Sequence, residues 1–493
     1  MKESSASYAK EAYAIIRHAA EEIGARLPGS ENERKFANYM GDKLRAIGVE
    51  PKKEEFAVSP RASIGGIPYA GWAGVILCIA SYFARAIPYL WFPMAALGLL
   101  TILWLVFSVF LYKPWFDMFF KQQVSQNVYG ELKPEDGEYD YTIILSGHTD
   151  TSWNWKHSEH AYKYKDKPIL GILATYGKVG LGAISFFVMA FYSIFQAVIY
   201  GGVILGAQWA EMALSGSQYM QYGLQPPAIA LFYASLDRWM LFVPILCCIF
   251  CFFVIMWADP HPENASRGAM DNASGIALSY EVLKYFKENP EQMPPRCRII
   301  DLNCGSEEAG LRGSMAFTAE HKNDDLVQNA WNINIDSVAD KDYFEVVIQD
   351  DWQFTRFDTD MEQMFKDTFA ELGIESKTNG CIHNPVGGCD STPMTKAGIK
   401  SVTFAAQNPI LTYYYHTWRD MPDRFEEETV GNGFDVVLGV IEKIAAFQAV
   451  NGYNGPQKKV KKTRPAVQPV VYDDVQEAAQ DDVQEDVQED TQI

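Results

Sequence analysis

Four long stretches without a charged residue restrict how this chain can fold. They cover residues 62–84, 86–112, 179–210 and 239–258. Each is close to or longer than the roughly 20 residues with which an α-helix crosses the hydrocarbon core of a bilayer. We therefore expect about four transmembrane helices, and the alternative is a large soluble core with four buried helices. The ends of the stretches carry aromatic residues typical of a membrane interface: Tyr89, Trp91, Trp239 and Trp257.

The four stretches form two pairs, and this pairing determines how the rest of the chain is organised. Because each pair crosses the membrane twice, the polar segments before, between and after the pairs lie on the same side. One polar domain can therefore assemble from three pieces. The uncharged stretch 212–236 is predicted to be a loop, because it contains Ser, Gln, Gly and a Pro-Pro pair. The predicted divisions are a first polar piece (1–60), a transmembrane hairpin (61–113), a second polar piece (114–168), a second hairpin with its connecting loop (169–258), a third polar piece (259–452) and a tail (453–493).

The formal net charge of −20 comes partly from the C-terminal tail. Residues 472–493 repeat the unit DVQE and contain no Lys or Arg. A segment of this composition cannot bury enough apolar surface to fold, so it is predicted to be disordered. The basic patch KKVKKTR before it (458–464) is interpreted as a solvated linker, with contact to anionic lipid as the alternative. So acidic a chain is unsuited to binding nucleic acid.

Basic residues are unevenly distributed across the predicted membrane. On the side of the polar pieces they cluster near the ends of the spans, whereas the opposite side carries little beyond Arg85 and Arg238. Cytoplasmic loops are enriched in Lys and Arg, so the polar domain is predicted to be cytoplasmic. The alternative is that these side chains bind particular lipids. The residues concerned are Arg61, Lys113, Lys121, Lys163, Lys165, Lys167 and Lys178.

The polar pieces show alternating strand and helix patterns. Short β-branched or apolar runs bounded by turn residues predict strands, and apolar residues at helical spacing predict helices. This alternation is typical of an α/β domain with a mostly parallel, twisted sheet. The predicted strands cover 139–145, 296–303, 329–335, 344–348 and 400–406, and the predicted helices cover 274–289, 358–373 and 433–450.

Acidic residues and histidines lie at the ends of these predicted elements. In open α/β sheets the ligand crevice lies beyond the carboxyl ends of the strands. Five loops are therefore expected to bring their polar side chains to one edge of the sheet. They carry His148 and Asp150 in SGHTDT, Asp271 in GAMDNASG, Glu307 and Glu308 in CGSEEAG, Asp336 in INIDS and His416 in YYYHTWRD.

A metal centre explains why so many carboxylates would gather at one place. Crowded carboxylates raise one another's pKa values and become neutral unless a cation compensates them. Two imidazoles and three carboxylates suit zinc, and a shared carboxylate allows two ions about 3.5–4 Å apart. Asp271 suits the shared position, because the N-terminus of a helix favours an anion. Two Zn²⁺ ions are predicted, with Co²⁺ or Mn²⁺ as alternatives.

Each motif alone has an ordinary explanation. A lone histidine usually packs in a core, DNASG around Asp271 could be a turn with a helix cap, and adjacent glutamates usually belong to a solvated loop. The five motifs together, each at a predicted strand end or helix start, favour a functional site. His157 and His160 in HSEH form the best rival metal pair, but that loop offers no evident third ligand.

The motifs HTD, GAMDNASGIA, SEEAGLRGS, NINIDS and YHTWRD resemble, in order and character, those of the zinc exopeptidase family that includes aminopeptidase Y, bacterial leucyl aminopeptidases and glutamate carboxypeptidase. The resemblance covers residues 16–56, 121–160 and 260–450, and includes GCDSTPMTKAGIKSVTF. The two hairpins depart from the soluble members. The resemblance implies a zinc-exopeptidase-like, three-layer α/β domain that the hairpins interrupt.

The resemblance also implies two sets of metal ligands. His148, Asp271 and Asp336 would hold one zinc ion. Asp271, Glu308 and His416 would hold the other. Asp271 would thus bridge the two ions.

Roles for Glu307, Asp150 and Asp390 rest on the same resemblance, and that of Tyr415 rests on its position beside His416. Glu307 would be the general base, taking a proton from the metal-bridging water that attacks the scissile carbonyl. Asp150 would orient His148 through a hydrogen bond. Tyr415 is a candidate for lining the substrate pocket. Asp390 lies in a loop that would border the site and is a second candidate for substrate binding.

The function implied is that of a membrane-bound zinc exopeptidase, most simply an aminopeptidase that acts on peptides and contacts the lipid bilayer. Carboxypeptidase action and cyclisation of N-terminal glutamine are alternatives, and the second is disfavoured because all five ligands are present. A receptor-like scaffold without activity would have no need of Glu307. A transporter would carry ionisable residues within its spans, where only the boundary residue Arg85 is found.

Overall fold

The computed structural model describes residues 5–164, 166–174, 176–215, 225, 227–384, 387–409 and 413–451. The chain divides into two units after Asn454, and every element below belongs to the first unit. The predicted acidic tail and the basic patch lie outside the described residues, as does most of the segment 216–226.

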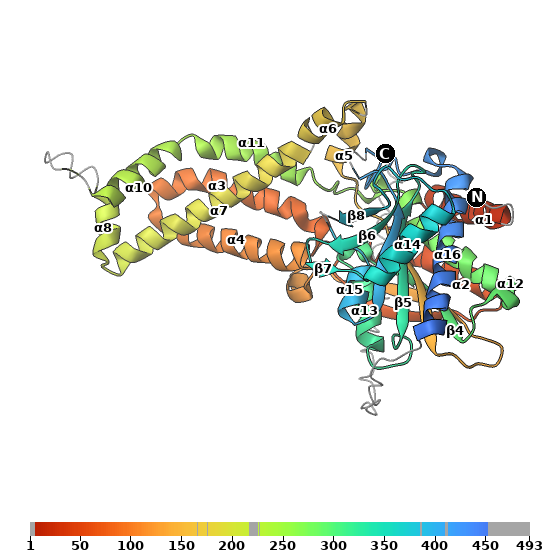
Figure 1. Cartoon of the computed structure of the whole chain (residues 1–493). Coiled ribbons are helices and arrows are strands. Elements are labelled where there is room, and N and C mark those ends of the chain that lie inside the picture. Colours follow the sequence, from red (N-terminus) through yellow and green to blue (C-terminus); the bar gives the residue numbers. More distant parts are fainter. Residues whose placement is uncertain are drawn as a thin grey trace, which may run out of the picture. The chain divides into compact units, whose positions relative to one another are not determined.

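In the part of the chain that the structure describes, a nine-stranded sheet lies at the centre of the polar domain (Figure 1). Its strands lie in the order β1-β2-β4-β3-β5-β9-β6-β7, and β8 pairs with β6. The central strands β4, β3, β5 and β9 are parallel, whereas β1, β2, β6 and β7 are added by antiparallel pairs. The strands are β1 Lys52–Val58, β2 Gln123–Leu132, β3 Tyr141–His148, β4 Cys297–Cys304, β5 Ala330–Val338, β6 Phe344–Asp350, β7 Thr355–Arg356, β8 Cys381–Asn384 and β9 Lys400–Ala406.

The sheet is mixed, which corrects the expectation of a mostly parallel sheet. All five predicted strands are present. Four of them, β3, β4, β5 and β9, are almost fully buried, and an apolar run in the sequence is a reliable sign of a buried strand. The strands that sequence patterns missed include the edge strand β1. Its sequence KKEEFAV is largely exposed, so it carries no apolar run.

Helices cover both faces of the sheet. Those on one face share a large core with the sheet, to which α1, α2, α12, α14 and α16 contribute. On the other face α13 and α15 contribute Phe317 and Met394 to a second core. The helices are α1 Ala6–Arg17, α2 Glu31–Ala46, α12 Gly275–Glu288, α13 Arg312–His321, α14 Thr359–Glu371, α15 Ser391–Lys396 and α16 Glu427–Asn451, and two shorter ones, α5 Lys156–Ala161 and α6 Pro168–Ala174, follow β3.

Among the residues that the structure describes, three helical segments are long and apolar enough to cross a membrane: Ile64–Ala86, Pro88–Phe110 and Ile169–Ile204. A fourth span requires α10 (Ala228–Trp239) and α11 (Val243–Ile255) to act together, although they are bent by 55°. The core helices of these spans, α3 (Ile67–Ala86), α4 (Trp91–Trp104), α7 (Tyr176–Ile204) and α11, pack against one another around a third core (Figure 1).

The prediction of a loop at 212–236 is wrong for most of the residues of this segment that the structure describes. Helix α8 (Gln208–Leu214) continues into its start, and α10 occupies its end. In α10 the run AIALFYASL has apolar residues at helical spacing, and it follows Pro227. Proline suits the start of a helix, because the first turn leaves its N–H groups unpaired in any case.

The end of the first apolar pair is attached to the loop that carries the adjacent glutamates. Arg312 donates hydrogen bonds to the carbonyl of Tyr112 (2.9 Å) and to Asp117 (3.0 Å). The buried Tyr112 ring packs against Gly310 and Gly388. A Cβ at Gly388 would lie 2.6 Å from that ring, so glycine is required there. The apolar pair therefore forms part of the framework around the candidate site.

Candidate metal centre

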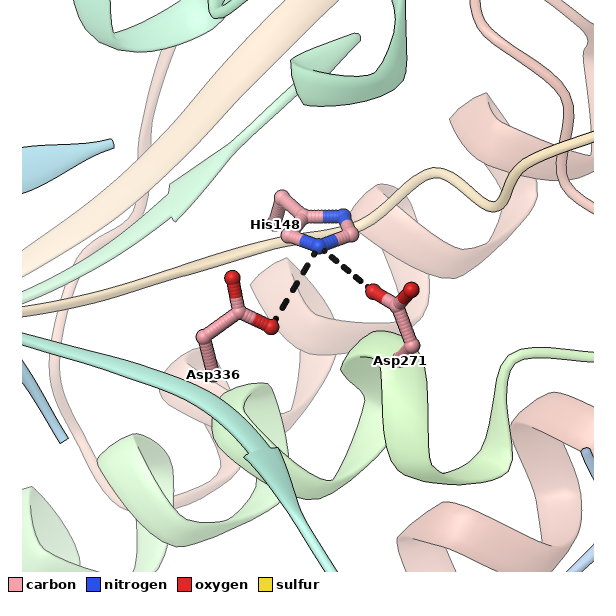
Figure 2. Close-up of side chains that lie close together, drawn as sticks. All are labelled: His148, Asp271 and Asp336. Atoms are coloured by element: carbon pink, nitrogen blue, oxygen red, sulfur yellow. Dashed lines mark ion pairs between the residues drawn. The ribbon is translucent and has the colours of Figure 1, made fainter. Parts of the chain in front are cut away.

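Five predicted side chains meet at the carboxyl ends of the central strands. His148 ends β3, and Figure 2 shows Asp271 and Asp336 facing its imidazole ring. The His148 Nε2 atom lies 3.0 Å from Asp271 Oδ1 and 3.7 Å from Asp336 Oδ1. One ligand atom from each of these three residues lies within 4.8 Å of the others, as a metal ion would require.

A second group of the same kind shares Asp271. The Asp271 Oδ2 atom lies 2.9 Å from His416 Nε2, and Glu308 Oε1 lies 2.8 Å from the same nitrogen. Asp271, Glu308 and His416 also satisfy the 4.8 Å condition. One carboxylate thus points an oxygen at each of two imidazoles. The two groups are the ligand sets that the resemblance implies, and metal binding itself stays a prediction.

The charges of the centre fit divalent cations. Burial alone would lower the pKa of His148, but Asp150, Asp271 and Asp336 raise it well above its usual value. Burial likewise opposes the charge of His416, yet nearby carboxylates raise its pKa to about 9. Protonated imidazoles therefore compensate the carboxylates here. Metal ions would supply the same positive charge and leave both rings neutral as ligands.

Glu307 is the remaining acid of the centre. It lines the same cavity as His148, Asp271, Glu308 and Asp336. Burial and the neighbouring carboxylates raise its pKa well above the usual value, although His148 opposes this. It belongs to neither ligand group. Its carboxylate is thus placed beside the predicted metals without being one of their ligands.

Asp150 connects His148 to the glutamate pair. Its carboxylate accepts the backbone N–H of Glu307 at 2.9 Å and that of Glu308 at 3.0 Å. The same carboxylate lies 3.3 Å from His148 Nδ1, and the backbone carbonyl of Asp150 is hydrogen-bonded to that nitrogen at 3.2 Å. The predicted orientation of His148 by Asp150 therefore has suitable geometry, and Asp150 also positions the loop of the predicted base.

Two further buried carboxylates hold ligand loops, and neither was predicted from the sequence. Glu33 accepts the N–H (2.7 Å) and the hydroxyl (2.8 Å) of Ser306. Asp420 accepts the N–H of Met270 at 2.8 Å and that of Asp271 at 3.0 Å. The motif YHTWRD contains Asp420, and its acidic end was the available signal. Glu33 lies at the start of a helix, where a capping role is the ordinary interpretation.

Arg26 is a third supporting residue that was not predicted from the sequence. Its guanidinium is fully buried and donates only to backbone carbonyls, including those of Thr149 (2.9 Å) and Gly268 (2.9 Å). Burial lowers its pKa to about 10, against the attraction of nearby acids such as Asp420. It therefore ties the loop after β3 to the loop that carries Asp271.

The His416 ring is held by aromatic packing. It stacks on Tyr415 with ring centres 3.8 Å apart, and Trp155 meets it edge-on at 4.2 Å. Its Nδ1 atom has no hydrogen-bond partner among the described residues. The rival residue His157 packs between Trp155 and Trp257 as a core histidine and belongs to neither ligand group.

A cavity of about 100 Å³ opens onto the centre. Tyr415 lines it, and substrate binding by Tyr415 stays a prediction. Asp390 is fully buried outside this lining, where it accepts the Ser314 hydroxyl at 2.5 Å, and its neighbour Cys389 lines the cavity. The lining residues are His148, Asp271, Glu307, Glu308, Asp336, Ser337, Glu345, Val347, Ile382, Asn384, Gly388, Cys389, Thr403, Ala405, Gln407 and Tyr415.

Comparisons with known proteins confirm the resemblance for the third polar piece. Residues 255–441 match the family described as Peptidase family M28. The chain is 26% identical to Aminopeptidase YwaD of Bacillus subtilis over 237 residues, which are 45% of this chain and 46% of that protein. It is 25% identical to Endoplasmic reticulum metallopeptidase 1 of Mus musculus over 186 residues, 36% of this chain and 19% of that protein. The chain thus covers less than half of each of these relatives. A zinc aminopeptidase structure from Bacillus subtilis aligns with a TM-score of 0.47 at 14% identity, covering 88% of this chain and 94% of that one.

Proposed function

We propose, from the match of residues 255–441 to Peptidase family M28, that this chain is a membrane-bound di-zinc exopeptidase, most simply an aminopeptidase. One observation carries the proposal. Asp271 belongs to two ligand groups at once, and Glu307 lines the cavity beside them without belonging to either. A shared carboxylate with a free acid nearby is the arrangement that hydrolysis at a pair of metal ions requires.

The residues fit zinc in number and type. His148, Asp271 and Asp336 would hold one ion, and Asp271, Glu308 and His416 would hold the other. When bound, the ions polarise the scissile carbonyl and make water nucleophilic at neutral pH. Their charge would also favour the ionised forms of the buried carboxylates, because burial otherwise raises the pKa of Glu307 and Glu308.

Glu307 performs the proton transfers of the reaction. Its carboxylate accepts a proton from the attacking water and then donates it to the leaving amine. Asp150 fixes the backbone of both Glu307 and Glu308, so the base keeps a constant position relative to the neighbouring ligand. Positioning of this kind matters, because proton transfer requires hydrogen-bond distance to the reacting water.

The cavity supports action at the end of a peptide. A volume of about 100 Å³ corresponds to about three waters, which is comparable to the size of one side chain. Its lining contains acidic residues and neither Lys nor Arg. A free α-amine is therefore attracted, whereas a substrate carboxylate would find no basic partner among these residues. This favours an aminopeptidase over a carboxypeptidase.

Blocking the two ends of a short peptide tests this assignment. We expect acetylation of the N-terminus to reduce kcat/KM by about 100-fold, because it removes a charged hydrogen-bonding group. Amidation of the C-terminus should change kcat/KM little. The measurement is product release by the detergent-purified protein. The opposite pattern would show a carboxypeptidase, and loss of ammonia from a glutaminyl peptide without hydrolysis would show a cyclase.

We further propose that α3, α4, α7 and the bent pair α10–α11 cross the bilayer, with the polar domain on the cytoplasmic side. A cysteine replacing the exposed Leu205 should react with a membrane-impermeant maleimide in intact cells. A cysteine replacing the exposed Glu50 should react only after permeabilisation. The reverse labelling would place the polar domain on the other side. There the exposed Asn264, in the sequence Asn-Ala-Ser, would be an acceptor for glycosylation.

A further inference from the structure

The cavity continues past the metal ligands to a wall made by three strands. Glu345 and Val347 face it from β6, flanked by Ala405 and Thr403 of β9 at the paired positions. Ile382 of β8 pairs with Val347 and completes the wall. These residues give the cavity an apolar side and a single acidic group on β6.

Glu345 is an unusual residue for such a wall. Its side chain is 1% exposed, and its Oε2 atom has no hydrogen-bond partner among the residues that the structure describes. Burial raises its pKa to about 8, although a hydrogen bond with Thr378 opposes this. An apolar residue would fill this position at lower cost, since a buried carboxyl group with one unpartnered oxygen is unfavourable. The Oε2 atom of Glu345 is therefore available to form a hydrogen bond with a bound group that is not part of the chain.

The chemistry of that partner follows from the wall. An apolar stem can lie along Val347, Ile382 and Ala405, and a cationic end can pair with Glu345. Lysine and arginine side chains combine these two features. A charge-assisted hydrogen bond to the unpartnered oxygen would offset the cost of burying the carboxylate.

We propose that Glu345 is a specificity-determining residue and that this cavity receives the side chain of an N-terminal lysine or arginine of the substrate. The inference rests on the proposed aminopeptidase function and deepens it by naming the substrate class. Val347, Ile382 and Ala405 contact the methylene groups, and Glu345 binds the charged end.

Lysine and norleucine substrates provide the test, because the two side chains share a four-carbon stem and differ in the terminal ammonium. We expect the metal-loaded enzyme to cleave a lysyl peptide with a kcat/KM about 10- to 100-fold higher than that for the norleucyl peptide. Glu345→Gln should remove this preference by lowering kcat/KM for the lysyl peptide alone. Glu375→Gln, at an exposed position outside the cavity, is the matched control and should keep the preference.

A binding measurement separates failure of this inference from failure of the proposed function. Titration of the zinc-loaded protein with lysinamide and norleucinamide should show tighter binding of lysinamide, and Glu345→Gln should abolish the difference. If peptides are cleaved but lysine is not preferred, or if the Gln variant keeps the preference, Glu345 does not determine specificity and the aminopeptidase proposal stands. If no aminoacyl peptide is cleaved by the metal-loaded protein, the proposed function fails. If the protein cleaves no peptide and binds the two amides equally, the inference is overturned as well. If it cleaves no peptide but binds lysinamide more tightly, and this difference depends on Glu345, the result supports the lysine subsite by itself.

Discussion

Replacing Glu307 with glutamine is expected to reduce kcat by about 10³-fold or more, because it removes the group that accepts and returns the proton. The substitution keeps the size of the side chain and lies outside both ligand groups. Two zinc ions should therefore remain bound to the variant. The measurements are peptide hydrolysis under substrate saturation and metal content after gel filtration.

Glu308→Gln is the matched control, since it makes the same chemical change one residue further along. The Glu308 carboxylate lies 2.8 Å from His416 Nε2 within the second ligand group. This variant should bind one ion less tightly, and added zinc should partly restore its activity. Added zinc should not rescue Glu307→Gln. Full activity of Glu307→Gln would show that another residue is the base, and loss of zinc from that variant would show that Glu307 is a ligand.

The backbone of this loop explains how adjacent glutamates take different positions. Ser306 and Leu311 adopt left-handed conformations with φ of 53° and 61°, and Gly310 has φ of 97°. Between them, Glu307 and Glu308 form one tight turn. Asp150 accepts both of their N–H groups. A strained turn held by one buried carboxylate thus keeps a base and a ligand side by side.

Four of the candidate ligands could be predicted from sequence because each lies at or just after the end of a short apolar run or at the start of a helix, whereas His416 lies in a loop ten residues beyond β9 and was indicated by its motif. His148 and Asp336 lie in the strands β3 and β5 themselves, and the parallel centre of the sheet brings their ends together. The order of such strands is unknown from the pattern, but their carboxyl ends share one edge in any order. The edge of the sheet that carries the site can therefore be predicted even when the order of the strands cannot.

The supporting residues could not be predicted, because their partners are distant in the sequence. Glu33 accepts hydrogen bonds from Ser306, and Arg26 donates to carbonyls that lie before α12. Glu345 belongs to an ordinary strand pattern, and only the cavity beside it makes its burial notable. Local patterns report burial and turns. They do not report which two loops a buried charge will join.

Removal of the metal ions is expected to abolish turnover and to lower the thermal stability of the protein. Bound zinc stabilises the folded state by about 4 kcal/mol per site when free zinc is a thousandfold above its Kd. The apoprotein should still fold, because the carboxylates raise the pKa of His148 and His416 and the protonated rings compensate part of the charge. Calorimetry before and after chelation should thus show a lower midpoint that added zinc restores. Chelation that leaves activity and midpoint unchanged would contradict the metal centre.

Variants of two ligands test whether the metal ions share a carboxylate. Asp271 belongs to both groups, whereas Asp336 belongs to one. Asp271→Asn should therefore weaken the binding of both ions, and Asp336→Asn should weaken the binding of one. Zinc content should fall from two towards zero in the first variant and towards one in the second. Retention of one tightly bound ion by Asp271→Asn would show that the two groups do not depend on a common ligand, because Asp271 is the only residue that they share.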